Sequence, residues 1–218
     1  MTPKLQRPFE MLATHVDYWP SYVDVLTIVL MVFILQNFLQ TVPNVDVYDM
    51  MRLRQAQDDL EQALREEFSG EVLLGKIHFE SSPNLLRVRF SEELLFPTKE
   101  YRLAEAGAQI MQRCAKVLGT VDESLYKKIQ VEGHTDNVPL LGASYPSNNW
   151  QLSSARALDV VTHMTTHGIR PEKLSANAYG EFDPFAGNDD PQGQAQNRRI
   201  ELLIVFSLPG RTTSPPSL

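Results

Sequence analysis

The sequence of 218 residues has almost no cysteine and no concentration of basic residues. Cys114 is the single cysteine, which excludes a disulfide within one chain. We expect this side chain to be a small buried apolar group on an amphipathic helix. The formal net charge is -7, with Lys and Arg dispersed along the chain. Because a phosphate backbone requires a basic surface, nucleic acid is excluded as a partner.

Sequence motifs of catalysis are also missing. The chain has no G-x-S-x-G, no Walker loop and no G-x-G-x-x-G, so hydrolase, nucleotide and dinucleotide classes lack support. His163 and His167 are spaced like a metal pair on a helix, but the glutamate of H-E-x-x-H is absent and no third ligand is evident. We therefore predict a protein that is not an enzyme and has no cofactor or metal, with these histidines solvated.

A long apolar run is present near the N-terminus. It extends from Tyr22 to Val42 and ends at Pro43. About 20 residues at a rise of ~1.5 Å cross a hydrocarbon core of ~30 Å. The run continues into QNFLQTVP, which has no small-x-small cleavage site. An uncleaved anchor is therefore favoured over a signal peptide or a buried core helix. We predict an N-terminal segment at 1–20 and a transmembrane helix at 21–42.

Asp24 lies near the start of this apolar run. Within SYVDVLTIVLMVFIL the only other ionisable side chain is Tyr22. A charge in that setting costs several kcal/mol unless it is compensated, so an intramembrane carboxylate is a hypothesis of function. The alternative is an aspartate at the membrane edge whose carboxylate reaches the headgroups.

The next segment, 43–70, is rich in helix formers and ends at Gly70. Its apolar residues follow a seam of roughly 3.5-residue spacing: Met50, Leu53, Leu60 and Leu64. Gln57 interrupts the seam. The pattern fits a short coiled-coil stalk between two copies, a helix on the membrane or on the next domain, or a solvated linker helix.

Strands and helices alternate from residue 71 to 208. The segments NLLRVRF, KKIQVEG, KLSANAYG and RRIELLIVF have strand patterns, and KEYRLAEAGAQIMQRCAKVLG has a helical one. A second helix is expected to begin at Ser153 as the N-cap and to end at Gly168. The alternation predicts one layered α/β-type domain with its helices on one face of a sheet. The Pro- and Ser-rich tail, 209–218, is expected to be disordered.

Several motifs in this domain resemble the OmpA-like peptidoglycan-binding domain over about residues 85–206. VEGHTDNVP, NNWQLSSARALDVV, AYGEFDP and NRRIELLI occur in the order of that family. NNWQLSSARA and the pair Phe96-Pro97 are most similar to its MotB branch. The resemblance implies an α+β chain: one transmembrane helix, a helical linker, and a βαβαβ domain with helices on one face of a mixed sheet.

The chemistry of the wall predicts what a binding site must contain. Diaminopimelate in a stem peptide presents an ammonium and a carboxylate together, so its site needs a fixed anion and a planar cation. Asp136 follows a strand and can supply the anion. Arg156, three residues after Ser153, is expected in the first turn of a helix, where free N–H groups also attract a carboxylate.

The resemblance assigns the same two residues, because in the family the Asp of HTDN and the Arg of LSSARA hold diaminopimelate. Thr135, Asn149 and Leu152 match neighbouring groove positions. Taken singly, Asp136 fits an Asx turn and Arg156 a surface charge. The insert LLGASYP lengthens the separation of the pair to 20 positions (156 minus 136). In NRRIE, Arg198 and Arg199 bind the wall or form ion pairs, and a structural role is favoured for at least one.

The apolar run also resembles the MotB transmembrane segment, in which Tyr-x-Asp is followed by Thr three residues on. The resemblance gives Asp24 the position of the ion-carrying aspartate and Thr27 that of the nearby hydroxyl, for protons or sodium ions. It implies a self-dimer in a MotA/MotB-type stator, with five multi-span A subunits around two B-subunit spans. The N-terminus is then cytoplasmic, the span lies in the inner membrane, and the folded domain is periplasmic.

Flagellar rotation is the process expected of such a stator. The weakly basic N-terminal segment and the short linker both depart from flagellar MotB proteins. The short linker resembles motor-like B subunits recruited to other processes, including the ZorB component of Zorya anti-phage systems. A purely structural anchor between membrane and wall is the alternative from another class.

Overall fold

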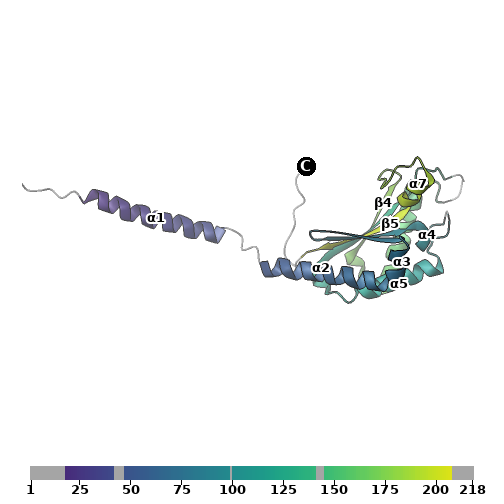
Figure 1. The fold of residues 1–218 in the computed structure, drawn as a ribbon, viewed down its shortest axis with the longest axis horizontal. Helices are drawn as coiled ribbons and strands as arrows, with labels where there is room; N and C mark the ends of the chain where they lie inside the picture. The colour runs from purple at the N-terminus through teal and green to yellow at the C-terminus, as the bar shows by residue number, and fades with distance from the viewer. Residues whose placement is uncertain (1–17, 42–46, 99, 141–144, 208–218) are drawn as a thin grey trace, which may run out of the picture. The chain divides into compact units, whose positions relative to one another are not determined.

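The structure is a computed structural model, which describes residues 18–41, 47–98, 100–140 and 145–207. The chain divides into two compact units, residues 1–45 and 46–218, which are treated separately below (Figure 1). The tail 209–218, Pro43 and most of the segment 1–20 lie outside the described residues.

The described residues of the first unit, 18–41, contain the helix α1 (Trp19–Thr41). Its 23 residues extend over about 35 Å, and Trp19–Leu39 is long and apolar enough to cross a membrane. The hydroxyl of Thr27 donates to the carbonyl of Val23 at 2.7 Å, so this polar group is satisfied within the helix. The predicted N-terminal apolar helix is therefore present.

The second unit is built on a five-stranded mixed sheet with strand order β1-β2-β5-β3-β4. The strands are β1 (Ile77–Ser82), β2 (Leu85–Ser91), β3 (Tyr126–His134), β4 (Leu174–Gly180) and β5 (Arg199–Phe206). Only the β3–β4 pair is parallel among these neighbours. The strand β5, the last in the described part of the chain, thus lies at the centre, between β2 and β3.

The helices of this unit are α2 (Val47–Glu67), α3 (Ser69–Leu73), α4 (Glu92–Leu95), α5 (Glu105–Leu118), α6 (Asn149–Thr166) and α7 (Pro191–Asn197). Two short 3-10 turns are η1 (Glu123–Leu125) and η2 (Pro171–Lys173). The core contains alternate residues of the three inner strands, such as Val88, Val131 and Leu202, together with residues of α2, α5 and α6. The predicted α+β fold, with a mixed sheet and helices on one face, is confirmed.

Close contact of β3 and α6 fixes one side of this core. A Cβ atom on Gly133 would lie 2.2 Å from the carbonyl oxygen of Ser153, so only glycine permits this approach. The hydroxyl of Ser153 accepts a hydrogen bond from the N–H of Gly180 at 3.1 Å.

The prediction of Ser153 as N-cap is wrong: Asn148 caps α6, accepting from the N–H of Gln151 at 2.9 Å. Cys114 is buried in this core as expected.

The helix α2 lies on the domain and shares its core. Leu53, Leu60 and Leu64 of the predicted seam are buried in the same cluster as the strands, whereas Met50 is exposed. Gln57 is 1% exposed, and its amide nitrogen donates to the carbonyls of Ser82 and Leu85 at 3.0 and 3.1 Å. Gln57, the polar residue that interrupts the apolar seam, therefore binds the β1–β2 hairpin. The sequence left several arrangements of this segment open. In the structure α2 packs on the domain that follows it in the chain.

The face of the sheet opposite the helices carries a network of ion pairs. Glu201 on β5 is buried, and its Oε1 accepts from Arg199 Nε at 2.7 Å and from Arg89 Nε at 3.0 Å. Burial acts to raise the pKa of Glu201, but these arginines outweigh it and lower the pKa. His134 on β3 lies in this network and stacks on Tyr179 with ring centroids 5.0 Å apart. Burial, with Arg199 nearby, lowers the pKa of His134 to about 4.

The packing of α2 predicts the effect of Leu64→Ala in a fragment of residues 46–218. The side chain is fully buried, so its truncation should lower the free energy of unfolding by about 2–5 kcal/mol. Met51→Ala on the same helix is the control, because Met51 is exposed and its loss should cost little. Urea unfolding measures both. Equal, small losses would show that α2 is a free linker.

The buried histidine predicts a pH dependence of folding. Between pH 6.5 and about 4, the unfolded chain binds a proton that His134 does not accept in the fold, so stability falls as the pH is lowered through this window. His134→Gln should reduce this fall by up to about 3 kcal/mol. His78→Gln is the control: His78 is exposed, so this variant should lose as much stability at low pH as the unmodified protein does. Urea unfolding at pH 7 and at pH 4.5 measures the difference. A fall of the same size in all three proteins would contradict the assignment.

Candidate functional site

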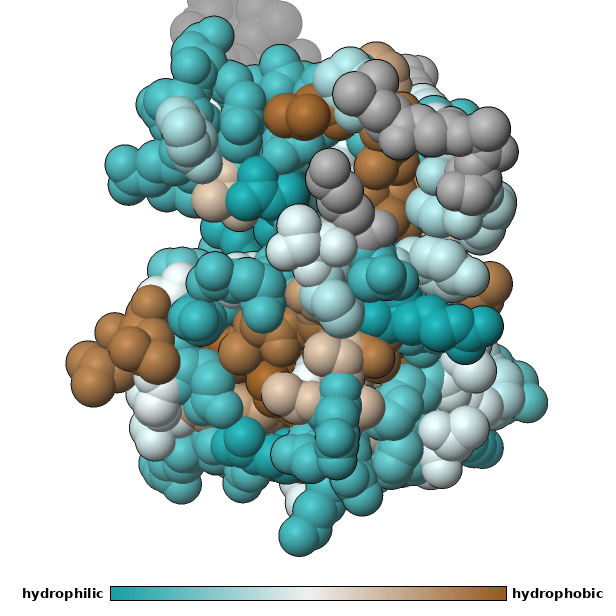
Figure 2. All heavy atoms as spheres, turned by 90° about the vertical axis from the view of Figure 1, so that its right-hand side faces the viewer, coloured by the Kyte–Doolittle hydropathy of each residue, from teal (hydrophilic) through white to brown (hydrophobic). Residues whose placement is uncertain are grey.

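A groove with a volume of about 860 Å³ opens at one end of the domain. It is lined by residues from the end of β2, the loop after β3, α4, the first half of α6, α7 and the start of β5. Figure 2 faces this end, where apolar side chains form the floor of a hollow among polar ones. Phe96 and Leu152 are among the apolar lining residues. Such a cavity, apolar with a few placed charges, is typical of a small-ligand site.

Asp136 lies two residues after β3, at the rim of this groove. Its Oδ1 accepts from the N–H of Val138 at 3.1 Å, which is the Asx-type turn considered from the sequence. Its Oδ2 lies 2.7 Å from Nη1 of Arg198. The residue therefore fixes the loop after β3 with one oxygen and forms an ion pair with the other.

Arg156 also lines the groove, but from the interior of α6. The prediction that it lies in the first turn is wrong, because α6 begins at Asn149. Its side chain is 2% exposed, with Nε donating to the carbonyl of Glu100 at 2.9 Å and the guanidinium 5.0 Å above the ring of Phe96. Nη2 forms an ion pair with Oε1 of Glu92. Burial lowers the pKa of Arg156, and Glu92 opposes this shift.

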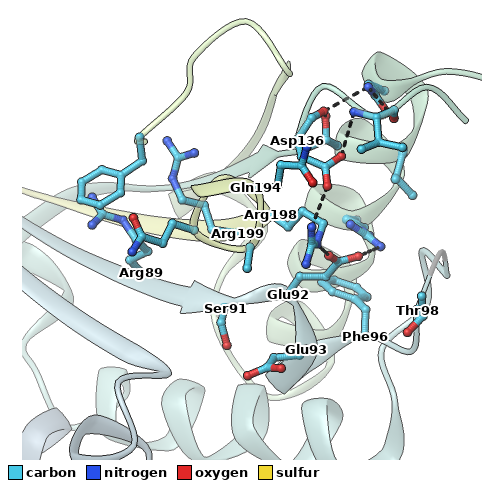
Figure 3. Close-up of a pocket in the computed structure, with 18 of the residues that line it drawn as sticks. Arg89, Ser91, Glu92, Glu93, Phe96, Thr98, Asp136, Gln194, Arg198 and Arg199 are labelled. Carbon is cyan, nitrogen blue, oxygen red and sulfur yellow. Dashed lines mark hydrogen bonds and ion pairs between the residues drawn. The ribbon is translucent and has the colours of Figure 1, made fainter. Parts of the chain in front are cut away.

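Asp136 and Arg156 are brought into one groove, yet they are connected through a second pair of charges. Arg198 Nε lies 2.7 Å from Glu92 Oε2, so the carboxylate of Glu92 contacts both arginines. The four residues form a line of alternating charge, Asp136–Arg198–Glu92–Arg156, which we call the charge row (Figure 3). Burial acts to lower the pKa of Arg198, but Asp136 and Glu92 outweigh it and raise the pKa.

Of the other groove positions suggested by the family, Thr135 and Asn149 form hydrogen bonds within the loop after β3, and Leu152 lines the groove. Thr135 is buried, and its hydroxyl donates to the carbonyl of Asp136 at 2.9 Å. The amide of Asn149 donates to the same carbonyl at 3.2 Å and to Glu181 Oε2 at 2.6 Å. Leu152 is buried and contributes to the apolar lining. Asp24 and Thr27 lie on α1, in the other compact unit.

The sequence did not identify Glu92 as a site residue and left Arg198 and Arg199 unassigned. Glu92 directly follows β2, and an acid at the end of a strand was the one available signal. In the structure Arg199 pairs with buried Glu201, whereas Arg198 points into the groove (Figure 3). The two adjacent arginines therefore have different surroundings.

A cluster with the residue types of a metal site lies on the open face of the sheet. Glu132, His134 and Glu201 offer ligand atoms within 4.8 Å of one another. The carboxylate of Glu201 is already bonded to arginines, which makes this an ion-pair network. His163 and His167 are half-buried instead of solvated, and Nδ1 of His167 lies 2.8 Å from the carbonyl oxygen of His163.

Comparison with known proteins relates the domain to one family. Residues 95–198 match the model of the OmpA family. The chain is 26% identical to the uncharacterized protein YtxE of Bacillus subtilis, over 89% of each chain. It is 38% identical to motility protein B of the same organism over 36% of this chain and 30% of that protein. The chain thus spans less than a third of that second relative.

Solved structures show the same fold. A putative MotB-like protein from Desulfovibrio vulgaris superposes with a TM-score of 0.64 at 24% identity, covering 72% of this chain and 99% of that one. The cell wall anchor of the T6SS from Pseudomonas aeruginosa gives a TM-score of 0.59 at 26% identity, covering 66% and 97%. Residues 95–198 are thus similar to the OmpA family, and the domain shares its fold with a MotB-like protein and with a cell wall anchor.

Proposed function

We propose that this protein is the B subunit of an ion-driven stator of the MotA/MotB type, held in the inner membrane by α1 and bound to peptidoglycan by its OmpA-family domain. The charge row in the groove is the observation that carries the wall-binding part of the proposal. The similarity to motility protein B and to a cell wall anchor supports the same conclusion.

The ligand proposed for the groove is the diaminopimelate of a stem peptide. Asp136 supplies the anion for its ammonium, and Arg156 supplies the planar cation for its carboxylate. Thr135 and Asn149 hold the loop that carries Asp136, and Leu152 covers the aliphatic part of the ligand. A groove of about 860 Å³ has the size of an ordinary small-ligand site.

The wall-binding proposal predicts the behaviour of the domain fragment, residues 46–218, in a peptidoglycan pull-down. Asp136→Asn with Arg156→Gln should abolish binding to diaminopimelate-type peptidoglycan, because both ends of the ligand lose their partner. Lysine-type peptidoglycan, which lacks the second carboxylate, should bind more weakly to the unmodified fragment.

The control for this pull-down is Asp58→Asn with Arg54→Gln, an exposed ion pair on α2 that should leave binding unchanged. Because Arg156 is buried, urea unfolding checks that each variant folds, and Asp136→Asn alone provides a variant that leaves Arg156 in place. Binding retained by the folded Asp136→Asn, Arg156→Gln protein would refute the site.

The ion-conducting part of the proposal rests on α1. Asp24 is a carboxylate in a helix apolar enough to span a bilayer, and such residues mark ion or proton paths. Thr27 lies three residues on, on the same helix face. Facing helices of a MotA-like partner, with five A subunits around two B spans, Asp24 would bind a proton or sodium ion and release it on the other side. The membrane potential contributes ~2.3 kcal/mol per charge per 100 mV.

A purely structural anchor is the second candidate function. The match to the T6SS cell wall anchor favours it, because that protein shares the wall-facing domain fold. Both candidate functions require wall binding by the groove. They differ in whether Asp24 conducts ions. Flagellar rotation is the proposed process for the stator, with a ZorB-type role in phage defence as its alternative.

Asp24→Asn separates the two functions. Expressed with its A partner, this variant should lose ion flux and the driven process, swimming or protection from phage, because an amide cannot bind and release a proton. Thr27→Ser keeps the hydroxyl and should retain flux. Dye-based flux assays in vesicles measure both. Unchanged flux in Asp24→Asn would leave the anchor as the function.

A further inference from the structure

We infer that Arg198 and Glu92 are internal stand-ins for the two charged groups of the ligand, so that ligand binding is an exchange of ion pairs within the charge row. The inference rests on the proposed diaminopimelate site at Asp136 and Arg156. It adds that Arg198 and Glu92 compete with the ligand for these two residues.

The order of charges in the row carries the inference. Asp136, the proposed partner of an ammonium, is bonded to the guanidinium of Arg198 at 2.7 Å. Arg156, the proposed partner of a carboxylate, is bonded to the carboxylate of Glu92. Arg198 and Glu92 are themselves joined at 2.7 Å. The joined pair Arg198–Glu92 therefore places a cation beside Asp136 and an anion beside Arg156. These are the two positions that the ammonium and the carboxylate of the ligand would occupy.

The ends of the row are fixed more firmly than its middle. Asp136 is held by the N–H of Val138, and Arg156 by the carbonyl of Glu100. Arg198 is the most open member, with a side chain 36% exposed, whereas that of Glu92 is 13% exposed. Arg198 precedes β5, and Glu92 is the first residue of the short helix α4. The middle pair can thus turn away while the ends keep their positions.

An exchange of this kind selects for a ligand with both charges. When an ammonium and a carboxylate enter together, Arg198 and Glu92 leave as a neutral pair that is still joined, and every charge keeps a partner. A ligand with only an ammonium displaces Arg198 from Asp136 but brings no carboxylate, so one cation of the row, Arg198 or Arg156, is left short of an anion. Because an unpaired charge in a partly buried site is costly, such ligands are rejected.

The internal pair also sets the affinity. Only the fraction of molecules in which the middle pair has left Asp136 and Arg156 can bind, so the apparent dissociation constant equals the intrinsic constant divided by that fraction. Removal of the internal competitor should therefore tighten binding. A purely structural role for the pair predicts the opposite, since loss of support would misplace Asp136 and Arg156.

Calorimetry on the full chain in detergent micelles tests the inference. The probe is the tripeptide L-Ala-γ-D-Glu-meso-diaminopimelate, and its lysine analogue measures selectivity. Glu92→Gln with Arg198→Gln keeps the shape of the Glu92 side chain and the net charge of the row, and it shortens the side chain at position 198. We expect the diaminopimelate tripeptide to bind on the order of tenfold tighter, with reduced discrimination against the lysine tripeptide.

The matched control is Glu123→Gln with Arg170→Gln, an exposed ion pair at 2.9 Å that does not line the groove and should leave both affinities unchanged. Arg198→Gln alone, at the most exposed member of the row, is the second variant, and it should also tighten binding because it frees Asp136. Thermal unfolding checks each fold.

The outcomes separate this inference from the proposed function. If the unmodified protein binds the tripeptide and the folded variants bind with unchanged or weaker affinity, the stand-in role is wrong and the wall-binding function stands. If the folded, unmodified protein binds neither the tripeptide nor peptidoglycan, both are overturned.

Discussion

The ion pairs of the charge row hold together four segments that are far apart in the chain. Asp136 follows β3, Arg156 belongs to α6, Glu92 begins α4, and Arg198 precedes β5. Their side chains meet at one end of the sheet, where the groove opens. Because charges removed from water are stable only when paired, the row constrains where each of these segments can lie. The shape of the groove depends on this constraint, and so does the selectivity that we propose for it.

The sheet and α2 supply the rigid support for that arrangement. With β5 at the centre, Arg198 is placed between the ends of β2 and β3, next to Glu92 and Asp136. The packing of α2 on the domain extends its core, so the fold begins before residue 71. A site built on the ends of central strands is held more precisely than one on isolated loops.

Local patterns in the sequence predicted the elements, whereas long-range pairing decided the site. The buried positions of Leu53, Leu60 and Leu64 follow from a helical seam, and the α+β class follows from alternating strands and helices. Glu92 was not predictable, because its partner Arg156 is 64 residues away and Arg198 is 106 positions away (198 minus 92). Ser153 was misread as a cap, since a serine that accepts from a neighbouring strand looks the same in sequence as one that caps a helix.

In the exchange that we propose, one zwitterionic group of a stem peptide replaces the middle pair of the charge row at Asp136 and Arg156. A crystal structure of the domain soaked with the diaminopimelate tripeptide tests this exchange. We expect the ligand ammonium to be bonded to Asp136, the ligand carboxylate to be bonded to Arg156, and the bond between Arg198 and Asp136 to be broken. A bound tripeptide with the Arg198–Asp136 and Glu92–Arg156 pairs intact would show that no exchange takes place.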